Sequence, residues 1–453
     1  MSKSKKIAIV HYRVGRTDGV SFEIDKRKCI LQRLGHEVKL ISGPVQSGAD
    51  FVIDELEFDS TPIRAIKENS FKYFGKLDYT PSDLINRIYF VAAKIEEAFL
   101  KYHENQKFDL ILLHNIFSHG RHIAAASAFA NLIQKLHIPV IATHHDCYWE
   151  REEYQEPSNN EIKKYLEIFV PPYLKWVTHI SISSIAQSQL WEKRGIKSVV
   201  FPDIFDFKQR AWQTDEYNSD FLTRVGVKPR DLVILQATRI VERKGIEIAI
   251  HFVKELEKYK RKVVGKKLYN GKMLTGDSVF VFVLAGYAEE SAQNYLIKIK
   301  KQIKESGIEA KFIHSLIAAK RSEVNNEKVY SLWDAYVHAD LVTYPSLSEG
   351  WGNQFIEAVF AKKPIVLFEY PVFKADIKKE GYDYISFGDK IDGVTDSGLV
   401  RLSNRNMEKA VKNTIQIMTS KTTVEQLKGN IRIGEKYHGF SVLQNFLRKA
   451  ISK

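Results

Sequence analysis

Hydrophobic residues in the first half of the chain form short continuous runs, separated by segments with helical spacing. Continuous β-branched and leucine runs are typical of parallel strands that are covered on both faces. They predict strands over 6–10, 38–41, 109–114, 139–144, 179–183 and 198–201. The segments between them predict helices over 21–34, 83–102, 123–136, 161–169 and 185–193. Strand and helix in alternation indicate a doubly wound α/β domain.

The same alternation starts again after a polar stretch at residues 208–229. Further predicted strands cover 231–238, 279–286, 311–316, 341–345 and 364–369. We therefore expect an α/β fold of two Rossmann-like domains, 1–207 and 208–432, that face a central cleft, because ligands bind at the carboxyl ends of such strands. A helix-like apolar stripe near the C-terminus predicts a last helix within 433–453.

Two insertions interrupt this pattern. Residues 51–80 show little periodicity, and residues 260–277 have the composition of a basic, turn-rich loop or hairpin. No segment approaches the roughly 18 to 20 apolar residues of a membrane-spanning helix. The basic N-terminus passes directly into a strand without a cleavage site, so we expect a cytoplasmic protein without stable membrane insertion.

Composition narrows the function classes. With 453 residues the chain is long enough for two hydrophobic cores. Its two cysteines, Cys29 and Cys147, exclude a disulfide framework and a thiolate zinc cluster. The net charge of +13 could attract nucleic acid or an anionic membrane, but the lysines are scattered and lack interleaved aromatic residues. We expect no nucleic-acid partner, although a basic non-enzymatic binder of nucleic acid or membrane surfaces stays an alternative. A monomer or a homodimer is expected.

The segment TYPSLSEGWGNQFIEA, residues 343–358, carries the most informative chemistry. A strand leads into a loop in which Gly350 and Gly352 flank Trp351, and a helix is predicted to follow Asn353. Backbone N–H groups at a helix N-terminus bind phosphate. Two carboxylates, Glu349 and Glu357, are suited to sugar hydroxyls and are separated by seven residues. The segment therefore predicts a nucleotide-sugar site.

Further polar residues follow other predicted strands. The loop TRIVERKG, residues 238–245, supplies Arg239 and Lys244, two fixed positive charges for a diphosphate. The histidines of LLHNIFSHGRH, residues 112–122, do not have a zinc spacing, and the chain has no Asp-X-Asp pair, so no metal is expected. The first glycine loop is not GxGxxG, which disfavours a dinucleotide oxidoreductase.

Together these segments resemble the GT-B glycosyltransferases of family 4, over nearly the whole chain. The Glu349-X7-Glu357 signature implies that Glu357 holds ribose hydroxyls, that Glu349 holds the donor sugar, and that Gly350, Trp351, Gly352 and Asn353 contact sugar and phosphate. The family likewise implies that Arg239 and Lys244 clasp the pyrophosphate. The implied reaction is retaining transfer of a hexose, mannose or glucose, from a nucleotide-sugar to a small hydroxyl acceptor, with no cofactor required. The last helix would cross back to the first domain.

The resemblance also assigns residues in the first domain. HYRVGRTDGVSFE, residues 11–23, resembles the family's glycine loop, with Gly19 nearest the donor phosphate. Thr143, His145 and Asp146 match a Thr-X-His-Asp element, which places His145, or its neighbour His144, near the reacting sugar. Residues implied on the acceptor side are Arg13, Arg16, Asp18, His114, Asn115 and Trp149.

Within the family, these motifs are similar to those of enzymes that make small compatible solutes. This similarity implies GDP-mannose or UDP-glucose as donor and a small anionic acceptor such as glucosylglycerate, with Arg13 or Arg16 as its carboxylate partner. A glycoside phosphorylase or a nucleotide-sugar epimerase of the same fold stays an alternative.

Overall fold

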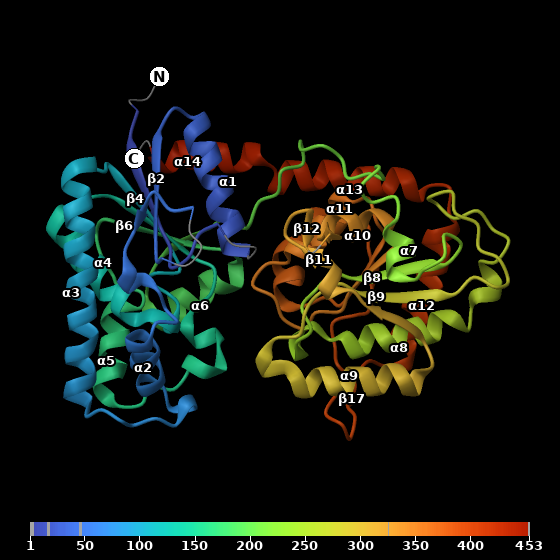
Figure 1. Ribbon diagram of the computed structural model, residues 1–453, viewed down its shortest axis with the longest axis horizontal. Coiled ribbons are helices and arrows are strands. Elements are labelled where there is room, and N and C mark those ends of the chain that lie inside the picture. The colour runs from blue at the N-terminus through green and yellow to red at the C-terminus, as the bar shows by residue number, and fades with distance from the viewer. Residues whose placement is uncertain (1–3, 16–18, 45–47, 325, 452–453) are drawn as a thin grey trace. The chain divides into compact units, whose positions relative to one another are not determined.

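The continuous hydrophobic runs form parallel strands in both halves of the chain. The computed structural model describes residues 4–15, 19–44, 48–324 and 326–451. It divides into unit 1, Met1–Ile204 with Phe440–Lys453, and unit 2, Phe205–Gly439. Each unit contains a parallel sheet with helices on its faces (Figure 1). The expected α/β fold with two Rossmann-like sheets is therefore confirmed.

The described strands of unit 1 form a seven-stranded parallel sheet in the order β3-β2-β1-β4-β5-β6-β7. The strands are β1 (Lys6–Val10), β2 (Glu37–Ser42), β3 (Phe51–Val52), β4 (Leu110–His114), β5 (Val140–His144), β6 (Val177–Ser181) and β7 (Ser198–Val200). The helices are α1 (Gly19–Arg33), α2 (Thr61–Ser70), α3 (Pro81–Gln106), α4 (Ile123–Leu136), α5 (Asn160–Phe169), α6 (Ser184–Arg194) and α14 (Phe440–Ile451).

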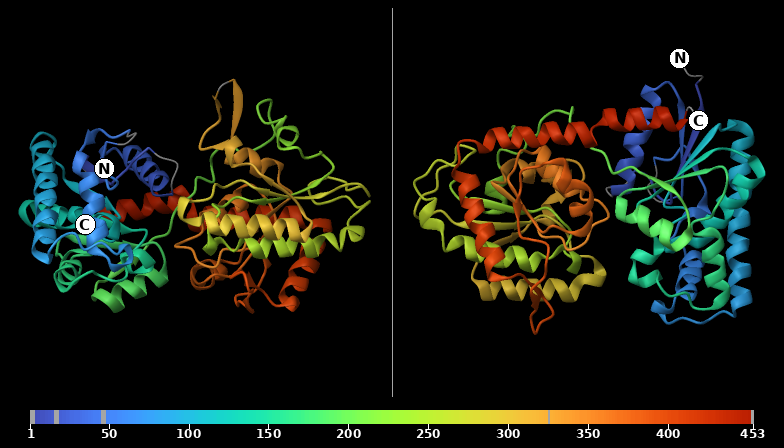
Figure 2. Two further views of the ribbon diagram at one scale, coloured as in Figure 1. Left: turned by 60° about the horizontal axis from the view of Figure 1, so that its bottom comes forward. Right: turned by 180° about the vertical axis from the view of Figure 1, so that it is seen from behind.

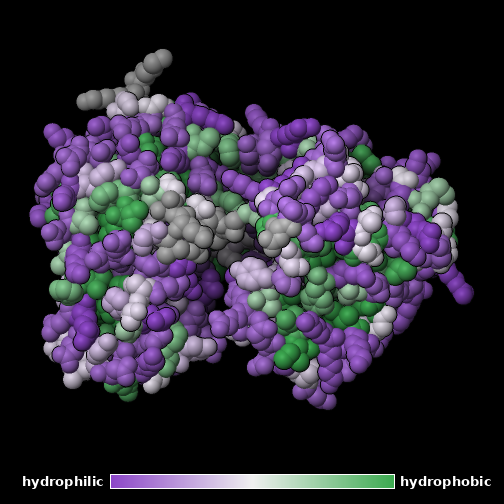
Figure 3. All heavy atoms as spheres, viewed as in Figure 1, coloured by the Kyte–Doolittle hydropathy of each residue, from purple (hydrophilic) through white to green (hydrophobic). Residues whose placement is uncertain are grey.

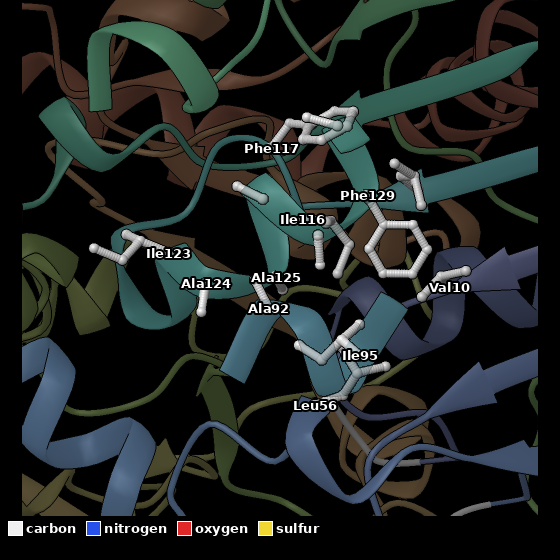
Figure 4. Packing of buried hydrophobic residues seen from close by; sticks show 14 of the residues in the cluster. Val10, Leu56, Ala92, Ile95, Ile116, Phe117, Ile123, Ala124, Ala125 and Phe129 are labelled. Carbon is white, nitrogen blue, oxygen red and sulfur yellow. The ribbon is translucent and has the colours of Figure 1, made fainter. Parts of the chain in front are cut away.

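Neighbouring residues of the central strands contribute to opposite hydrophobic clusters. Ile111 and Leu113 of β4 belong to the cluster that includes α3 and α4, which lie side by side (Figures 1 and 4). Leu110 and Leu112 belong to the cluster that includes α1 and α14. All five residues of β4 are buried, which explains why its sequence is continuously apolar rather than alternating.

Six of the described strands of unit 2 form a parallel sheet in the order β10-β9-β8-β14-β15-β16. The strands are β8 (Leu232–Gln236), β9 (Phe280–Leu284), β10 (Glu309–Phe312), β14 (Leu341–Tyr344), β15 (Ile365–Leu367) and β16 (Ile385–Ser386). The helices are α7 (Phe221–Val225), α8 (Ile246–Glu257), α9 (Gln293–Ser306), α10 (Leu332–His338), α11 (Asn353–Phe360), α12 (Asn404–Thr419) and α13 (Thr423–His438). Helices α8 and α9 lie side by side (Figures 1 and 2).

Several elements differ from the pattern-based predictions. The expected strand at 311–316 occupies Glu309–Phe312, and residues His314–Leu316 form a 3-10 turn. The insertion at 51–80 contains α2, which has only two buried apolar side chains and so gives little periodic signal. Two small sheets were also missed, one of β11 (Ile317–Ala318), β12 (Ser322–Val324) and β13 (Glu327–Ser331), the other of β17 (Gly393–Val394) and β18 (Val400–Arg401).

Candidate active site

The two loops of unit 2 that carry the predicted donor motifs lie at the switch point of its sheet. From β8 the chain continues to β9 on one side of the sheet, and β14 pairs with β8 on the other side. The loops at 237–245 and 345–352 therefore leave the carboxyl ends of adjacent strands. In open α/β sheets this crevice is where ligands bind. The two motifs selected from the sequence are thus brought together by topology.

A glycine turn joins these two loops. Gly245 has φ +58°, and a Cβ atom there would lie 2.5 Å from the carbonyl oxygen of Pro345. The Leu347 N–H donates to the Arg243 carbonyl oxygen at 2.8 Å. Only a residue without a side chain allows this approach. As a result, the side chains at positions 243 and 244 face the residues that follow β14.

Glu349 accepts from two cations at this junction. Its Oε2 lies 2.7 Å from the Arg243 guanidinium, and its Oε1 pairs with the Lys244 ammonium group. The side chains of Lys244 and Glu349 are only 4% and 8% exposed. Burial alone would raise the pKa of Glu349, but the charges of Lys244 and Arg243 outweigh it and lower the pKa to about 2. The carboxylate is therefore ionised throughout the physiological pH range.

Arg239 lies apart from this carboxylate. Its guanidinium pairs with Glu289, and 42% of its side chain is exposed. Its charge nevertheless helps to lower the pKa of Lys244, after the larger effect of burial. Of the two predicted cations, the structure joins Lys244 to Glu349, while Arg243, which the sequence analysis did not select, supplies the second contact. The sequence signal that could have identified Arg243 is its position beside Lys244 in the segment ERKG. The spacing alone does not show which of the basic side chains turns inward.

The loop before α11 is fixed by a close backbone approach. Gly352 has φ +137°, and a Cβ atom there would lie 2.0 Å from the hydroxyl of Tyr370. That hydroxyl donates to the carbonyl oxygen of Trp351 at 2.7 Å. The Trp351 ring is buried and packs edge-on against His438, with 5.1 Å between ring centroids. The indole of Trp351 is therefore a core side chain, and a ligand at this loop would meet exposed Gly350 and backbone groups.

The helix that follows carries the second signature carboxylate. Asn353 is the first residue of α11, and Glu357 lies one turn later. Glu357 is half-buried, and its Oε2 accepts from the Tyr336 hydroxyl at 3.1 Å. This bond and burial raise the pKa of Tyr336 well above its ordinary value, burial being the larger cause. The tyrosine therefore remains a proton donor to Glu357.

In unit 1, His145 is held at both its backbone and its ring. Its N–H donates to Asn115 Oδ1 at 2.7 Å, and its ring Nε2 lies 3.0 Å from His114 Nδ1. Its ring Nδ1 lies 3.5 Å from Asp203 Oδ1. The neighbouring His144 instead contacts His179, at 2.9 Å between Nε2 and Nδ1. The two adjacent histidines thus belong to separate side-chain pairs.

Other residues expected on the acceptor side have structural contacts. Asn115 adopts φ +57°, and its Oδ1 also accepts from the Asp146 N–H at 3.3 Å, so it acts as a clamp for the 145–146 backbone. Trp149 is half-buried and donates from its indole to Gln189 at 3.2 Å. Gly19 begins α1.

The first glycine loop is only partly described. Arg13 pairs with Glu57 and with Asp59, the latter at 2.6 Å, and its guanidinium lies over the Phe58 ring. Arg13 is therefore engaged by the 51–80 insertion. The expected acceptor residues Arg16 and Asp18 lie outside the described residues.

The remaining histidines of the 112–122 segment contact backbone groups. His119 accepts from the Arg121 N–H at 3.1 Å, and His122 lies 2.6 Å from the Glu55 carbonyl oxygen. Burial lowers the pKa of His119 to about 3 and that of His122 to about 4. Among the described residues, no group of three or more His, Cys, Asp or Glu side chains has an arrangement that could hold a metal ion.

Comparison with known proteins connects these sites to a family. Residues 220–430 match the model of the glycosyl transferases group 1, and residues 30–206 match that of Glycosyltransferase Family 4. The chain belongs to this glycosyltransferase family. This glycosyltransferase is 38% identical to the mannosylglucosylglycerate synthase of Petrotoga mobilis, over 94% of this chain and 96% of that one. It is 34% identical to the Thermotoga maritima protein of the same name, over 98% and 99%.

Solved structures confirm the GT-B fold of the glycosyltransferase. The Anabaena protein HepE in complex with UDP and glucose matches with a TM-score of 0.60 and 16% identity, covering 99% of both chains. Sucrose-phosphate synthase from Thermosynechococcus elongatus also gives 0.60, with 13% identity, over 99% of this chain and 98% of that one. The enzyme is thus a glycosyltransferase that uses a nucleotide-sugar donor.

The surface of the glycosyltransferase agrees with its composition. The face drawn in Figure 3 is mostly hydrophilic, with hydrophobic residues in small groups. Within the described part of the chain, no helix is both long and apolar enough to cross a membrane.

Proposed function

We propose that the glycosyltransferase transfers a mannosyl group from GDP-mannose to a hydroxyl of glucosylglycerate, with retention of configuration and without a metal. The observation that carries the transferase assignment is the buried contact of Glu349 with Lys244 and Arg243 at the switch point of unit 2. The near full-length identity to two mannosylglucosylglycerate synthases supports this donor and acceptor.

The charges near Glu349 suit a diphosphate leaving group. Lys244 and Arg243 together carry one more positive charge than Glu349 balances, and Arg239 adds another cation nearby. Charge-assisted hydrogen bonds to phosphate contribute about 1.5 to 3 kcal/mol each, and more as charge develops in the transition state. We propose that these cations and the N-terminus of α11 replace the metal ion that other transferases use.

The remaining roles follow the order of groups along the donor. In this proposal Glu357 binds the ribose hydroxyls, Glu349 binds a hydroxyl of the donor sugar, and backbone at Gly350 and Asn353 approaches the sugar and phosphate. The acceptor hydroxyl forms a bond to the anomeric carbon on the face from which the phosphate oxygen leaves. The acceptor proton passes to the departing diphosphate, so no covalent enzyme intermediate forms. His145 and Gly19 belong to the proposed site in unit 1.

Product analysis tests the reaction. The enzyme is incubated with EDTA and one donor, GDP-mannose, UDP-glucose or ADP-glucose, together with glucosylglycerate or without an acceptor. We expect an α-linked mannosyl product from GDP-mannose by mass spectrometry and by the anomeric coupling in NMR spectra. Product formation with UDP-glucose but not with GDP-mannose would overturn the proposed donor. Conversion of the donor without an acceptor would indicate an epimerase, and a requirement for inorganic phosphate would indicate a phosphorylase.

Matched variants test the donor site. Glu349→Gln and Glu357→Gln should each reduce kcat/KM for the donor by about 10²- to 10³-fold, the effect of removing one transition-state contact. Glu408→Gln is the control, because Glu408 is an exposed carboxylate on α12 that pairs only with Lys412 among the described ion pairs. Equal activity of all three variants would contradict the proposed donor site.

The carboxylate of the acceptor needs a cationic partner. Because Arg13 is paired with Glu57 and Asp59, we propose that Arg16 serves this role. Arg16→Ala should reduce activity with glucosylglycerate and spare activity with neutral glucosylglycerol. Equal losses with both acceptors would show that Arg16 does not recognise the carboxylate.

A further inference from the structure

A buried polar cluster surrounds the ring of His145 in unit 1. Asp203 lies in the segment after β7, and its Oδ1 is 3.5 Å from His145 Nδ1. Glu23 and Arg27 enter the same region from α1, and both side chains are fully buried. None of these three residues was assigned a role from the sequence, although Glu23 ends the 11–23 segment. The proposed chemistry uses His145 and assigns nothing to the groups behind it.

We infer that Asp203 is a positioning residue, which fixes the orientation and the tautomer of His145 for the transfer reaction. This inference rests on the proposed function only in its last step, because the arrangement of the ring can be measured without any substrate. Asp203 would not touch the reacting sugar. It would act through His145. Its carboxylate would face the proton of one ring nitrogen, which determines that the other ring nitrogen carries no proton.

The ring partners determine where the proton lies. In this proposal His145 Nδ1 carries the proton that faces the Asp203 carboxylate, across the 3.5 Å of a charge contact rather than a formed hydrogen bond. His145 Nε2 is then an acceptor, and it lies 3.0 Å from His114 Nδ1, which must be the donor. His114 consequently also has its proton on Nδ1 and none on Nε2. Burial lowers the pKa of His114 well below its ordinary value, which keeps that ring neutral.

Asp203 is itself anchored on α1. The N–H of the next residue, Ile204, donates to Glu23 Oε1 at 3.2 Å, and its carbonyl oxygen accepts from the Lys26 ammonium group. Burial lowers the pKa of Arg27, and the carboxylates of Glu23 and Asp203 oppose that lowering. The position of Asp203 is therefore set by α1, the helix that begins directly after the first glycine loop.

The contacts make His145 rigid from two directions. Asn115 fixes its backbone, His114 lies within hydrogen-bond distance of one ring nitrogen, and the Asp203 carboxylate faces the other ring nitrogen at 3.5 Å. Loss of the Asp203 charge would leave the backbone in place and release only the ring. An asparagine at this position can donate as well as accept, so it permits the other tautomer of His145. This difference allows a positioning role to be separated from a general structural role.

The primary test reads the ring protonation in the wild-type enzyme. Long-range ¹H–¹⁵N NMR spectra of the histidine-labelled protein, recorded without substrate, distinguish protonated from bare ring nitrogens. Signals of His145 and His114 are assigned with the variants His145→Gln and His114→Gln. We expect both rings to be protonated at Nδ1 and bare at Nε2. A His145 ring protonated at Nε2 alone would overturn the inference, even if the transferase activity is as proposed.

The second test uses Asp203→Asn, with Asp109→Asn as its control. Asp109 is exposed and precedes β4. It accepts from the Lys6 N–H at the amino ends of β1 and β4, whereas Asp203 follows the carboxyl end of β7 in the same sheet. Asp203→Asn should introduce Nε2 protonation at His145 and lower kcat by about 10- to 100-fold, as for other partners that orient a functional histidine. KM for the donor should change by less than about twofold. Asp109→Asn should leave the spectrum and kcat unchanged.

The outcomes separate the two proposals. An unchanged His145 tautomer together with an unchanged kcat in a folded Asp203→Asn variant would refute the positioning role. A changed tautomer without mannosyl transfer by the wild-type enzyme would instead refute the proposed substrates and leave the ring arrangement established. Should Asp203→Asn fail to fold, the wild-type spectrum still decides the tautomer.

Discussion

Replacing Glu349 by glutamine removes the carboxylate that balances Lys244 and Arg243. The neighbouring cations lower the pKa of Glu349 from 4.5 to about 2, although burial opposes them. A shift of this size corresponds to about 3 kcal/mol of preference for the ionised form in the folded protein, at 1.36 kcal/mol per pKa unit. The glutamine has a similar shape, so the change tests charge rather than packing.

The cost of the substitution also includes the lysine. Burial lowers the pKa of Lys244 even with Glu349 beside it. Desolvation of the lysine therefore offsets part of the stabilisation that comes from the ionised Glu349. Without Glu349, the buried ammonium group keeps that cost and loses its nearest anion. We expect Glu349→Gln to destabilise unit 2 by about 3 kcal/mol, within the range for breaking a buried pair. For a unit of this size that lowers Tm by about 6 to 12 °C.

Calorimetry of wild type and variant as a function of pH provides the assay. A carboxylate with a lowered folded-state pKa stabilises the fold above its unfolded-state pKa, and this stabilisation is lost as pH falls through the folded-state value. The difference in Tm should therefore be complete near pH 7 and shrink as pH falls from 4.5 towards about 2. The double variant Glu349→Gln/Lys244→Met should recover part of the loss, and Glu408→Gln should have no measurable effect. A pH-independent difference between Glu349→Gln and wild type would refute the electrostatic reasoning.

Substitutions at Gly352, Lys363 and Asn115 test other contacts. Gly352→Ala places Cβ against the Tyr370 hydroxyl at φ +137°, so it should cost at least about 1 to 3 kcal/mol and impair donor turnover, whereas Gly276→Ala, in open space, should do neither. Lys363→Met should raise the free energy of unfolding by about 1 to 3 kcal/mol near pH 7, because burial lowers the pKa of this lysine to about 8. The advantage of the variant should fade as the pH rises from 8 to 10.5. Denaturant titrations at several pH values measure both effects. Asn115→Ala should lose about 1 to 3 kcal/mol by chemical denaturation, and Asn115→Gly should recover only the backbone part of that loss.

The sequence predicted the sheets well because their signal is local. Each buried strand such as β4 consists of adjacent residues that all enter the core, so the run is visible without any knowledge of its partners. The small elements were missed for the converse reason. Helix α2 buries only Ile63 and Ile66 as apolar side chains, and β17 and β18 are two residues each, too short for a periodic pattern.

The contacts of the charged residues were much less predictable. A spacing of five residues made Arg239 and Lys244 look equivalent, but the turn at Gly245 directs Lys244 inward and leaves Arg239 beside Glu289. Asp203 had no local signal, because its partner His145 is brought close only by the packing of loops from different strands. Such pairings depend on three-dimensional register, which hydrophobic periodicity does not encode.

The contact of Glu349 with Lys244 and Arg243 also changes how the proposed donor site would operate. An ammonium group has three donors and a guanidinium has five, so both cations can keep Glu349 and still donate to phosphate oxygens. Because the carboxylate already orients both side chains, little reorganisation is needed when charge develops on the leaving diphosphate. In the proposed reaction Glu349 therefore has two roles, as a hydroxyl acceptor for the sugar and as the anion that holds the cations in place. A substitution at Glu349 should accordingly weaken binding of free GDP, which has no hexose, whereas a residue that contacts only the sugar would leave GDP affinity unchanged.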